Sequence, residues 1–192
     1  MPKITKIGHW TIANQLIMKI STIILSSFLI ISSLFAEKKL FDGKSLKGWD
    51  GDQKFWSVQD GAILGQTTKE NPTKGNTFLI WKDGKLGDFE LTLDYKIIAG
   101  NSGIQYRSFV KPGKNDGWRI GGYQADLEAG DKFSGICYGE GFRGILSMRG
   151  MKTTLTLDDK GKLKKDAKQF GDSAEIGKAV KKGKWNKYKI TA

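Results

Sequence analysis

Apolar and polar residues alternate along much of the chain after residue 36. The stretch 89–97 (FELTLDYKI) shows this best, because every second side chain is apolar and the intervening ones are charged or threonine. A period of two predicts a strand with one buried and one solvated face. Other segments of the same character, separated by glycine-rich turns, are 55–66, 104–108, 121–130, 135–140, 144–150, 153–165 and 184–192.

These segments predict an all-β protein. Residues 55–66 form a hairpin around Asp60-Gly61, and 104–108 follows 89–97 after a glycine turn, as its antiparallel neighbour would. Only 172–179 indicates a helical turn. Many short strands favour two packed antiparallel sheets. The large side chains expected to fill the space between the sheets are Phe78, Leu79, Trp81, Phe89, Tyr95, Trp118 and Trp185.

The first 36 residues have a different character. Met18-Lys19, an apolar run over 20–34 and the small Ala36 before a charged segment are typical of a secretory signal peptide. The apolar run, about 15 residues, is short for a membrane span, which needs ~20. We therefore expect an upstream extension (1–17), a signal peptide (18–36) and one secreted or periplasmic domain (37–192), with no membrane span after cleavage.

Histidine is absent from the predicted domain, since the only histidine is His9. Its absence excludes a Ser-His-Asp triad, a Cys-His pair and histidine-ligated zinc within residues 37–192. Cys137 is the single cysteine, so no disulfide can form within the chain. A buried thiol that packs as a small hydrophobe is the simplest interpretation of Cys137.

The chain carries 32 Lys+Arg against 20 Asp+Glu. Three of the basic residues and no acidic residue precede Glu37, which leaves a balance of +9, much of it in 160–168 and 178–187. Solvated lysine loops explain this excess, and binding of an anionic polysaccharide is the alternative. No nucleic-acid-binding module is recognisable, so we expect no nucleic acid as partner.

The strongest candidate for chemistry is the segment 123–128 (YQADLE). In a strand, Gln124, Asp126 and Glu128 lie on one face, with alternate side chains roughly 6.5–7 Å apart along the backbone. Paired glycosidase carboxylates can use such separations. An outer sheet face wetted by solvent is the alternative.

A second polar row lies in 100–108 (GNSGIQYRS). Gln105 and Arg107 alternate with apolar residues, and Arg107 offers five donors in a fixed fork. If both rows lie on one concave sheet, they would surround a sugar. The remaining candidates for sugar contacts have open alternatives. The aromatic residues could pack in the core, and Glu140 and Arg143 could form a surface ion pair. These candidates are Asn101, Trp118, Tyr138, Glu140 and Arg143.

No cofactor motif is present. The chain contains neither G-x-x-x-x-G-K-[ST] nor a strand-to-helix G-x-G-x-x-G, the two phosphate-binding glycine loops. Asp158-Asp159-x-Gly161 is too short for a calcium loop. We expect no cofactor and no metal, with a calcium ion held by scattered oxygens as the alternative.

Together these segments resemble the 3-keto-disaccharide hydrolase domain family. The opening LFDGKSLKGWDG (40–51) and the motif N-S-G-I-Q-Y-R are specific to it. The resemblance implies a concanavalin A-like jelly roll of two antiparallel sheets, here without the family's last strands. The other matching segments, in the family's order, are 55–65, 87–97, 100–108, 118–130, 138–146 and 185–192.

The resemblance also implies cleavage of glycosides whose carbon 3 is a ketone. The ketone acidifies the hydrogen on carbon 2, so its removal gives an enolate that expels the carbon 1 substituent; water addition then completes a net hydrolysis. The alternatives are a carbohydrate-binding module and a laminarinase-type glucanase, whose E-x-D-x-E strand has its nucleophile where this chain has Gln124. The roles expected for the keto sugar reaction are Asp126 as base, Arg107 with Gln105 at the enolate, and Glu128 or Glu140 as acid.

Overall fold

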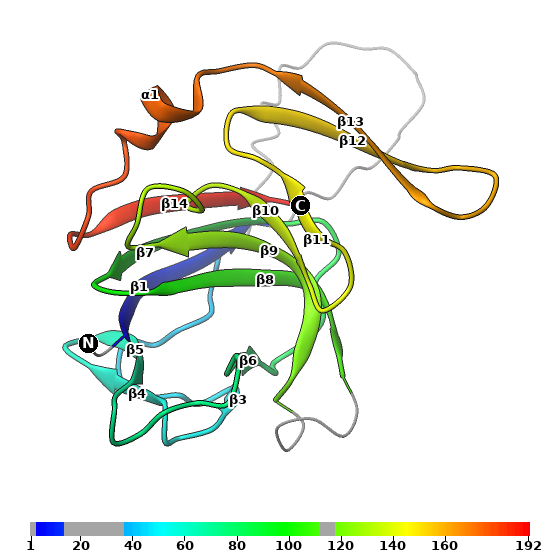
Figure 1. Ribbon diagram of the computed structural model, residues 1–192. Helices are drawn as coiled ribbons and strands as arrows, with labels where there is room; N and C mark the ends of the chain where they lie inside the picture. Colours follow the sequence, from blue (N-terminus) through cyan, green and yellow to red (C-terminus); the bar gives the residue numbers. More distant parts are fainter. Residues whose placement is uncertain (1–2, 14–36, 112–117) are drawn as a thin grey trace, which may run out of the picture.

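The computed structural model describes residues 3–13, 37–111 and 118–192, which form two facing β-sheets (Figure 1). All strand pairs are antiparallel, which confirms the predicted all-β sandwich. The larger sheet is ordered β14 (Asn186–Thr191), β7 (Glu90–Ile97), β1 (Lys3–Ala13), β5 (Ala62–Thr67) and β4 (Trp56–Gln59), with β2 (Lys38–Lys39) paired to β1. The smaller sheet is ordered β11 (Gly144–Ser147), β10 (Cys137–Glu140), β9 (Ile120–Glu128) and β8 (Asn101–Val110).

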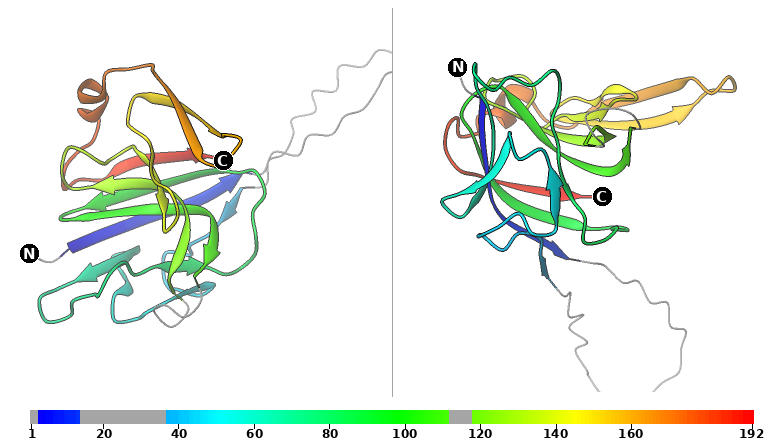
Figure 2. Two further views of the ribbon diagram at one scale, coloured as in Figure 1. Left: turned by 45° about the vertical axis from the view of Figure 1, so that its right-hand side comes forward. Right: turned by 90° about the horizontal axis from the view of Figure 1, so that it is seen from below.

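Two further strand pairs lie outside these sheets. The first joins β3 (Trp49–Gly51) to β6 (Leu79–Trp81), and the second is the hairpin of β12 (Met151–Leu157) and β13 (Leu163–Gln169). The hairpin projects from the body of the molecule (Figure 2). The one helix among the described residues, α1 (Ser173–Gly177), begins after Asp172, whose carboxylate accepts the Glu175 backbone N–H. This turn lies where the sequence predicts it.

The core fills the space between the two sheets. The predicted alternation of β7 is confirmed, since its apolar row is buried while the intervening side chains are not. Phe89 and Tyr95 join the core as expected, whereas Trp185 is 43% exposed and Trp118 bonds to Asp50 at the surface. The buried cluster consists of Trp10, Leu40, Phe41, Ile63, Phe89, Leu91, Leu93, Tyr95, Ile97, Ile104, Ala125, Leu127 and Ile190.

The expected pairing of 89–97 with 104–108 is wrong. β7 lies between β14 and β1 in the larger sheet, while β8 pairs with β9 in the smaller one. The glycine segment between β7 and β8 therefore carries the chain from one sheet to the other. Both strands present apolar faces to the same core. The alternation of apolar and polar residues therefore does not indicate that the chain passes from one sheet to the other between them.

Residues 3–13, which the sequence interpretation places in an upstream extension (1–17), form strand β1 of the larger sheet. β1 lies between β5 and β7 and pairs with both (Figure 1, dark blue). Thr5 and Trp10 are both buried although they are five residues apart, because a bulge between Gly8 and Trp10 shifts the register by one residue. The bulge interrupts the period of two. The predicted signal peptide, 18–36, lies outside the described residues.

Candidate functional site

The two polar rows predicted from the sequence lie side by side on one face of the smaller sheet. In the register of β8 and β9, Gln105 is opposite Gln124 and Asn101 is opposite Glu128. Directly paired residues share a sheet face. Ala125 and Leu127 point the other way, into the core. We call this set the polar row; it comprises Asn101, Gln105, Gln124, Asp126 and Glu128.

Asp126 is the most perturbed carboxyl group of the polar row. It is 4% exposed, and its Oδ1 accepts a hydrogen bond from Gln124 Nε2 at 2.6 Å. Burial raises the pKa of Asp126 to about 6, and repulsion from Glu140 and Glu128 adds to the rise, while hydrogen bonds from Gln124 and Asn101 oppose it. A carboxylate with such a pKa can exchange a proton near neutral pH.

Gly103 explains how Gln124 reaches Asp126. Gly103 is opposite Asp126 across the β8–β9 pair, and a Cβ on it would lie 2.6 Å from Gln124 Cγ. The missing side chain therefore leaves the space in which the Gln124 amide lies. Gly103 therefore allows a neighbouring side chain of the protein to approach the backbone of β8 closely.

Gln105 is the unsatisfied member of the polar row. Both its Nε2 and its Oε1 are buried and have no hydrogen-bond partner within the described residues. A buried amide without partners costs roughly 1–3 kcal/mol of stability. Its position opposite Gln124, two residues from Asp126 along β9, offers a donor and an acceptor to a ligand.

The other two carboxylates proposed for chemistry are already engaged. Glu128 Oε2 accepts the backbone N–H groups of Lys132 and Phe133 at 3.0 and 2.8 Å, which holds the loop after β9. Glu140 is 5% exposed and forms an ion pair with Arg119 Nη2 at 2.7 Å. The open alternative of an ion pair between Glu140 and Arg143 is thus replaced by one with Arg119.

Arg107 does not continue the polar row as the alternation predicts. A bulge interrupts the β8–β9 register between Tyr106 and Phe109, and Arg107 itself has φ +46°. Its exposed guanidinium donates to Asp88 at 2.8 Å. The bulge therefore turns Arg107 away from Gln105, the residue with which it was expected to act.

Three predicted contact residues are dispersed. Tyr138 is half-buried on β10, directly opposite Gln124, and so lies beside the polar row. Trp118 donates its indole N–H to Asp50 at 2.8 Å, near β3. Arg143 is exposed, with its guanidinium carbon 5.2 Å from the Phe142 ring centroid. Of these three residues, only Tyr138 lies next to the polar row, where it is paired with Gln124.

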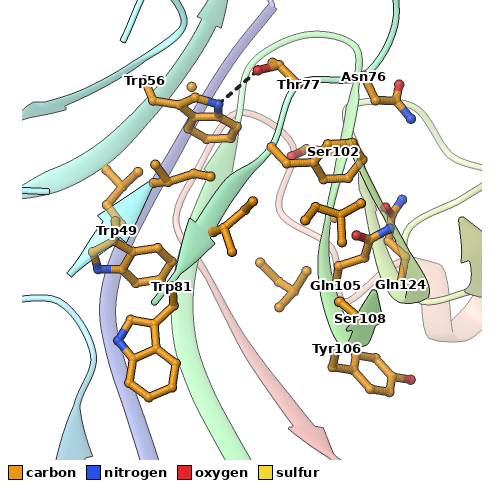
Figure 3. A pocket seen from close by; sticks show the side chains of 18 of the residues that line it. Trp49, Trp56, Asn76, Thr77, Trp81, Ser102, Gln105, Tyr106, Ser108 and Gln124 are labelled. Atoms are coloured by element: carbon orange, nitrogen blue, oxygen red, sulfur yellow. Dashed lines mark hydrogen bonds between the residues drawn. The ribbon is translucent and has the colours of Figure 1, made fainter. Parts of the chain in front are cut away.

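A cavity of about 890 Å³ runs along β8, the edge strand of the smaller sheet. Figure 3 shows Gln105 and Gln124 at one side of it and three indoles at the other, from β3, β4 and β6. We call Trp49, Trp56 and Trp81 the tryptophan wall. The sequence interpretation did not assign these residues to a site, although three tryptophans within 49–81 are a usable signal.

Neither a metal cluster nor a membrane-spanning helix is found among the described residues. Among residues 3–13, 37–111 and 118–192, no group of three or more His, Cys, Asp or Glu side chains could hold a metal ion. No helix in the same part of the chain is long and apolar enough to cross a bilayer.

Comparison with known proteins gives one result. A family model described as a 3-keto-alpha-glucoside-1,2-lyase-like domain matches residues 36–192. No curated protein and no solved structure matches the sequence. The match covers most of the chain. This protein therefore belongs to the family of 3-keto-alpha-glucoside-1,2-lyase-like domains.

Proposed function

We propose that the protein cleaves glycosides that carry a ketone at carbon 3 of the sugar, by elimination across carbons 1 and 2. The observation that carries the proposal is a buried carboxyl group, Asp126, with a pKa raised to about 6, beside the unpartnered amide of Gln105. A base near neutrality and a donor for a developing oxyanion are the two groups that such an elimination needs.

In this reaction Asp126 takes the proton from carbon 2, and the electrons of that bond form the enolate with the ketone. The enolate oxygen accepts a hydrogen bond from Gln105 Nε2. As the enolate collapses to a carbon 1–carbon 2 double bond, the bond between carbon 1 and the glycosidic oxygen breaks, and its electron pair leaves with that oxygen. Subsequent addition of water to the double bond gives the net hydrolysis product.

The structure supports fewer residues as base, enolate donor and acid than the sequence suggests. Arg107, expected at the enolate, is paired with Asp88 beyond the bulge, so Gln105 alone keeps this role. Glu128 and Glu140, the candidate acids, already bind backbone N–H groups and Arg119. Gln124 orients Asp126 by its hydrogen bond, and its uncharged amide cannot serve as a glucanase nucleophile.

The direct test is incubation of the protein with a 3-keto-disaccharide and with the unmodified disaccharide, followed by NMR of the products. Release from the keto sugar alone, with a 1,2-unsaturated or hydrated keto sugar as product, supports the proposal. Release from the unmodified sugar indicates a glucanase, and binding without release indicates a carbohydrate-binding module. Either of these two results contradicts the proposal.

Turnover is expected to follow the ionisation of Asp126. Because the base must be ionised, kcat/KM should rise with pH and level off above about pH 6. The free energy of unfolding should change with pH in the opposite direction. Because the pKa of Asp126 in the folded protein lies above its ordinary value of 3.8, the contribution of Asp126 to stability falls as pH rises from about 4 to about 6. A pH–rate profile that stays flat down to pH 4.5 would remove Asp126 as the base.

Gln105→Leu should separate stability from activity. Leucine removes a buried amide that has no partner, so the free energy of unfolding should rise by about 1 kcal/mol. Loss of one oxyanion donor should lower kcat by roughly 10²–10³-fold. Urea unfolding and steady-state kinetics measure the two effects. A leucine variant that is destabilised, or that keeps full kcat, contradicts the role of Gln105.

A further inference from the structure

A second cavity lies on the outer face of the larger sheet. In the strand register, Asp94 of β7 is opposite Gly8 of β1 and Lys187 of β14. Leu93 and Tyr95, the neighbours of Asp94 along β7, belong to the core, so Asp94 points outward. The cavity over this face has a volume of about 640 Å³, within the ~300–1,000 Å³ typical of small-ligand sites. The polar row lies on the outer face of the other sheet, so the two sites are on opposite sides of the sandwich.

Trp185 borders this cavity with an indole that is 43% exposed. A Cβ on Gly8 would lie 3.7 Å from the indole Cζ3, so the ring lies over the outer face of β1. Lys96 Nζ is 5.7 Å from the ring centroid, within the range of a cation–π contact. These two contacts hold the ring while leaving much of it open to solvent.

The loop that carries Trp185 is fixed by the next residue in the chain. Asn186 is 9% exposed, and its Oδ1 accepts the backbone N–H of Lys181 at 2.8 Å. Its Nδ2 donates to the carbonyl groups of Lys181 and Lys184, both at 2.9 Å. Because a buried amide holds the loop at three points, the indole is positioned before any ligand arrives. A side chain that is already positioned costs less ordering entropy when a ligand binds.

The charges that line this cavity are balanced. Two of the lining residues are acidic, Asp60 and Asp94, and two are basic, Lys181 and Lys187. No ion pair joins Asp94 to Lys187 within the described residues, although they are opposite in the register, so both groups can bond to a ligand. Carboxylates accept hydrogen bonds and ammonium groups donate them. A polyanion or a polycation would meet as many like charges as opposite ones here, whereas a neutral ligand with hydroxyl groups can use both kinds.

We propose that this cavity is a second carbohydrate-binding site, which holds a neutral glycan with one pyranose ring stacked on Trp185. A pyranose with equatorial hydroxyl groups, such as glucose, presents C–H groups on its flat faces and hydroxyl groups around its rim. The C–H face fits the apolar surface of the indole. The rim hydroxyl groups donate to Asp94 and accept from Lys187. The site uses no residue of the proposed elimination and goes beyond it.

Isothermal titration with cellohexaose tests this site, because the probe carries no ketone and is not a substrate of the proposed elimination. The parent protein should bind it, and Trp185→Ala should weaken binding roughly tenfold, as expected for loss of a stacked ring. Trp185→Phe, which keeps an aromatic surface, should weaken it about threefold or less. Asp126→Asn, on the opposite side of the sandwich, should bind as the parent does. No binding by the parent, or binding lost in Asp126→Asn and kept in Trp185→Ala, overturns the proposal.

Two further measurements separate a neutral glycan from other occupants. Binding of cellohexaose should change less than about twofold between roughly 0.05 and 0.5 M NaCl, because no net charge is paired. Binding of heparin without binding of cellohexaose overturns the proposal in favour of a polyanion. Self-association in sedimentation velocity that Trp185→Ala abolishes also overturns it, because the face is then an interface between copies of the chain. Turnover of a 3-keto-disaccharide should be equal in Trp185→Ala and the parent, so failure of the elimination leaves this binding test intact.

Discussion

Replacing Asp126 by asparagine is expected to lower kcat/KM for a 3-keto-glucoside by roughly 10²–10⁴-fold. Asparagine keeps the shape of the side chain beside Gln124, but its amide cannot take the proton from carbon 2. The fold should persist, since the variant removes a carboxyl group whose pKa is raised by burial. At pH 7 its melting temperature should therefore equal or exceed that of the parent.

Asp166→Asn is the matched control for this experiment. Asp166 lies exposed on the projecting strand β13, so the same chemical change there should alter neither activity nor melting temperature. A stable Asp126→Asn protein that retains activity within tenfold of the parent would contradict the assignment of Asp126 as base. Loss of the folded state would contradict the separate expectation that an amide is tolerated at this buried position.

The alternation in the sequence correctly predicts which way side chains face, and this accounts for most of the candidate site. Gln124, Asp126 and Glu128 share a face because three successive even positions of one strand must do so. The same pattern contains no information about which strand lies beside it. For this reason the sequence wrongly predicts that 89–97 pairs with 104–108, although the two segments belong to different sheets.

Bulges are the second reason why the prediction failed locally. One extra residue in a strand moves each following side chain to the opposite face of the sheet. Arg107 therefore does not lie in the same row as Gln105. In β1 a bulge places Thr5 and Trp10 on the buried face at an odd spacing, which conceals the strand. The tryptophan wall was missed for another reason: its members come from three different strands, and only tertiary structure gathers them around one cavity.

The position of β1 conflicts with the cleavage expected at the end of the predicted signal peptide. A signal peptidase cut after Ala36 would remove residues 3–13, and with them the strand that pairs with both β5 and β7. The resulting gap would leave two ladders of backbone groups unpaired and would uncover the core around Trp10, which is only 7% exposed. We therefore expect the larger sheet to depend on β1 for its stability.

Deletion of residues 1–36 is accordingly expected to abolish cooperative unfolding, seen as loss of near-ultraviolet circular dichroism and of a thermal transition. Trp10→Ala probes the same strand with a smaller change and should cost about 3–5 kcal/mol, a large part of the 5–15 kcal/mol that stabilises typical domains. Trp185→Ala, at an exposed indole, should cost about 0.5 kcal/mol or less. A chain of residues 37–192 that melts within a few degrees of the full chain would contradict the structural role of β1. The same result would make cleavage after Ala36 compatible with the fold, because the larger sheet would then be stable without its central strand.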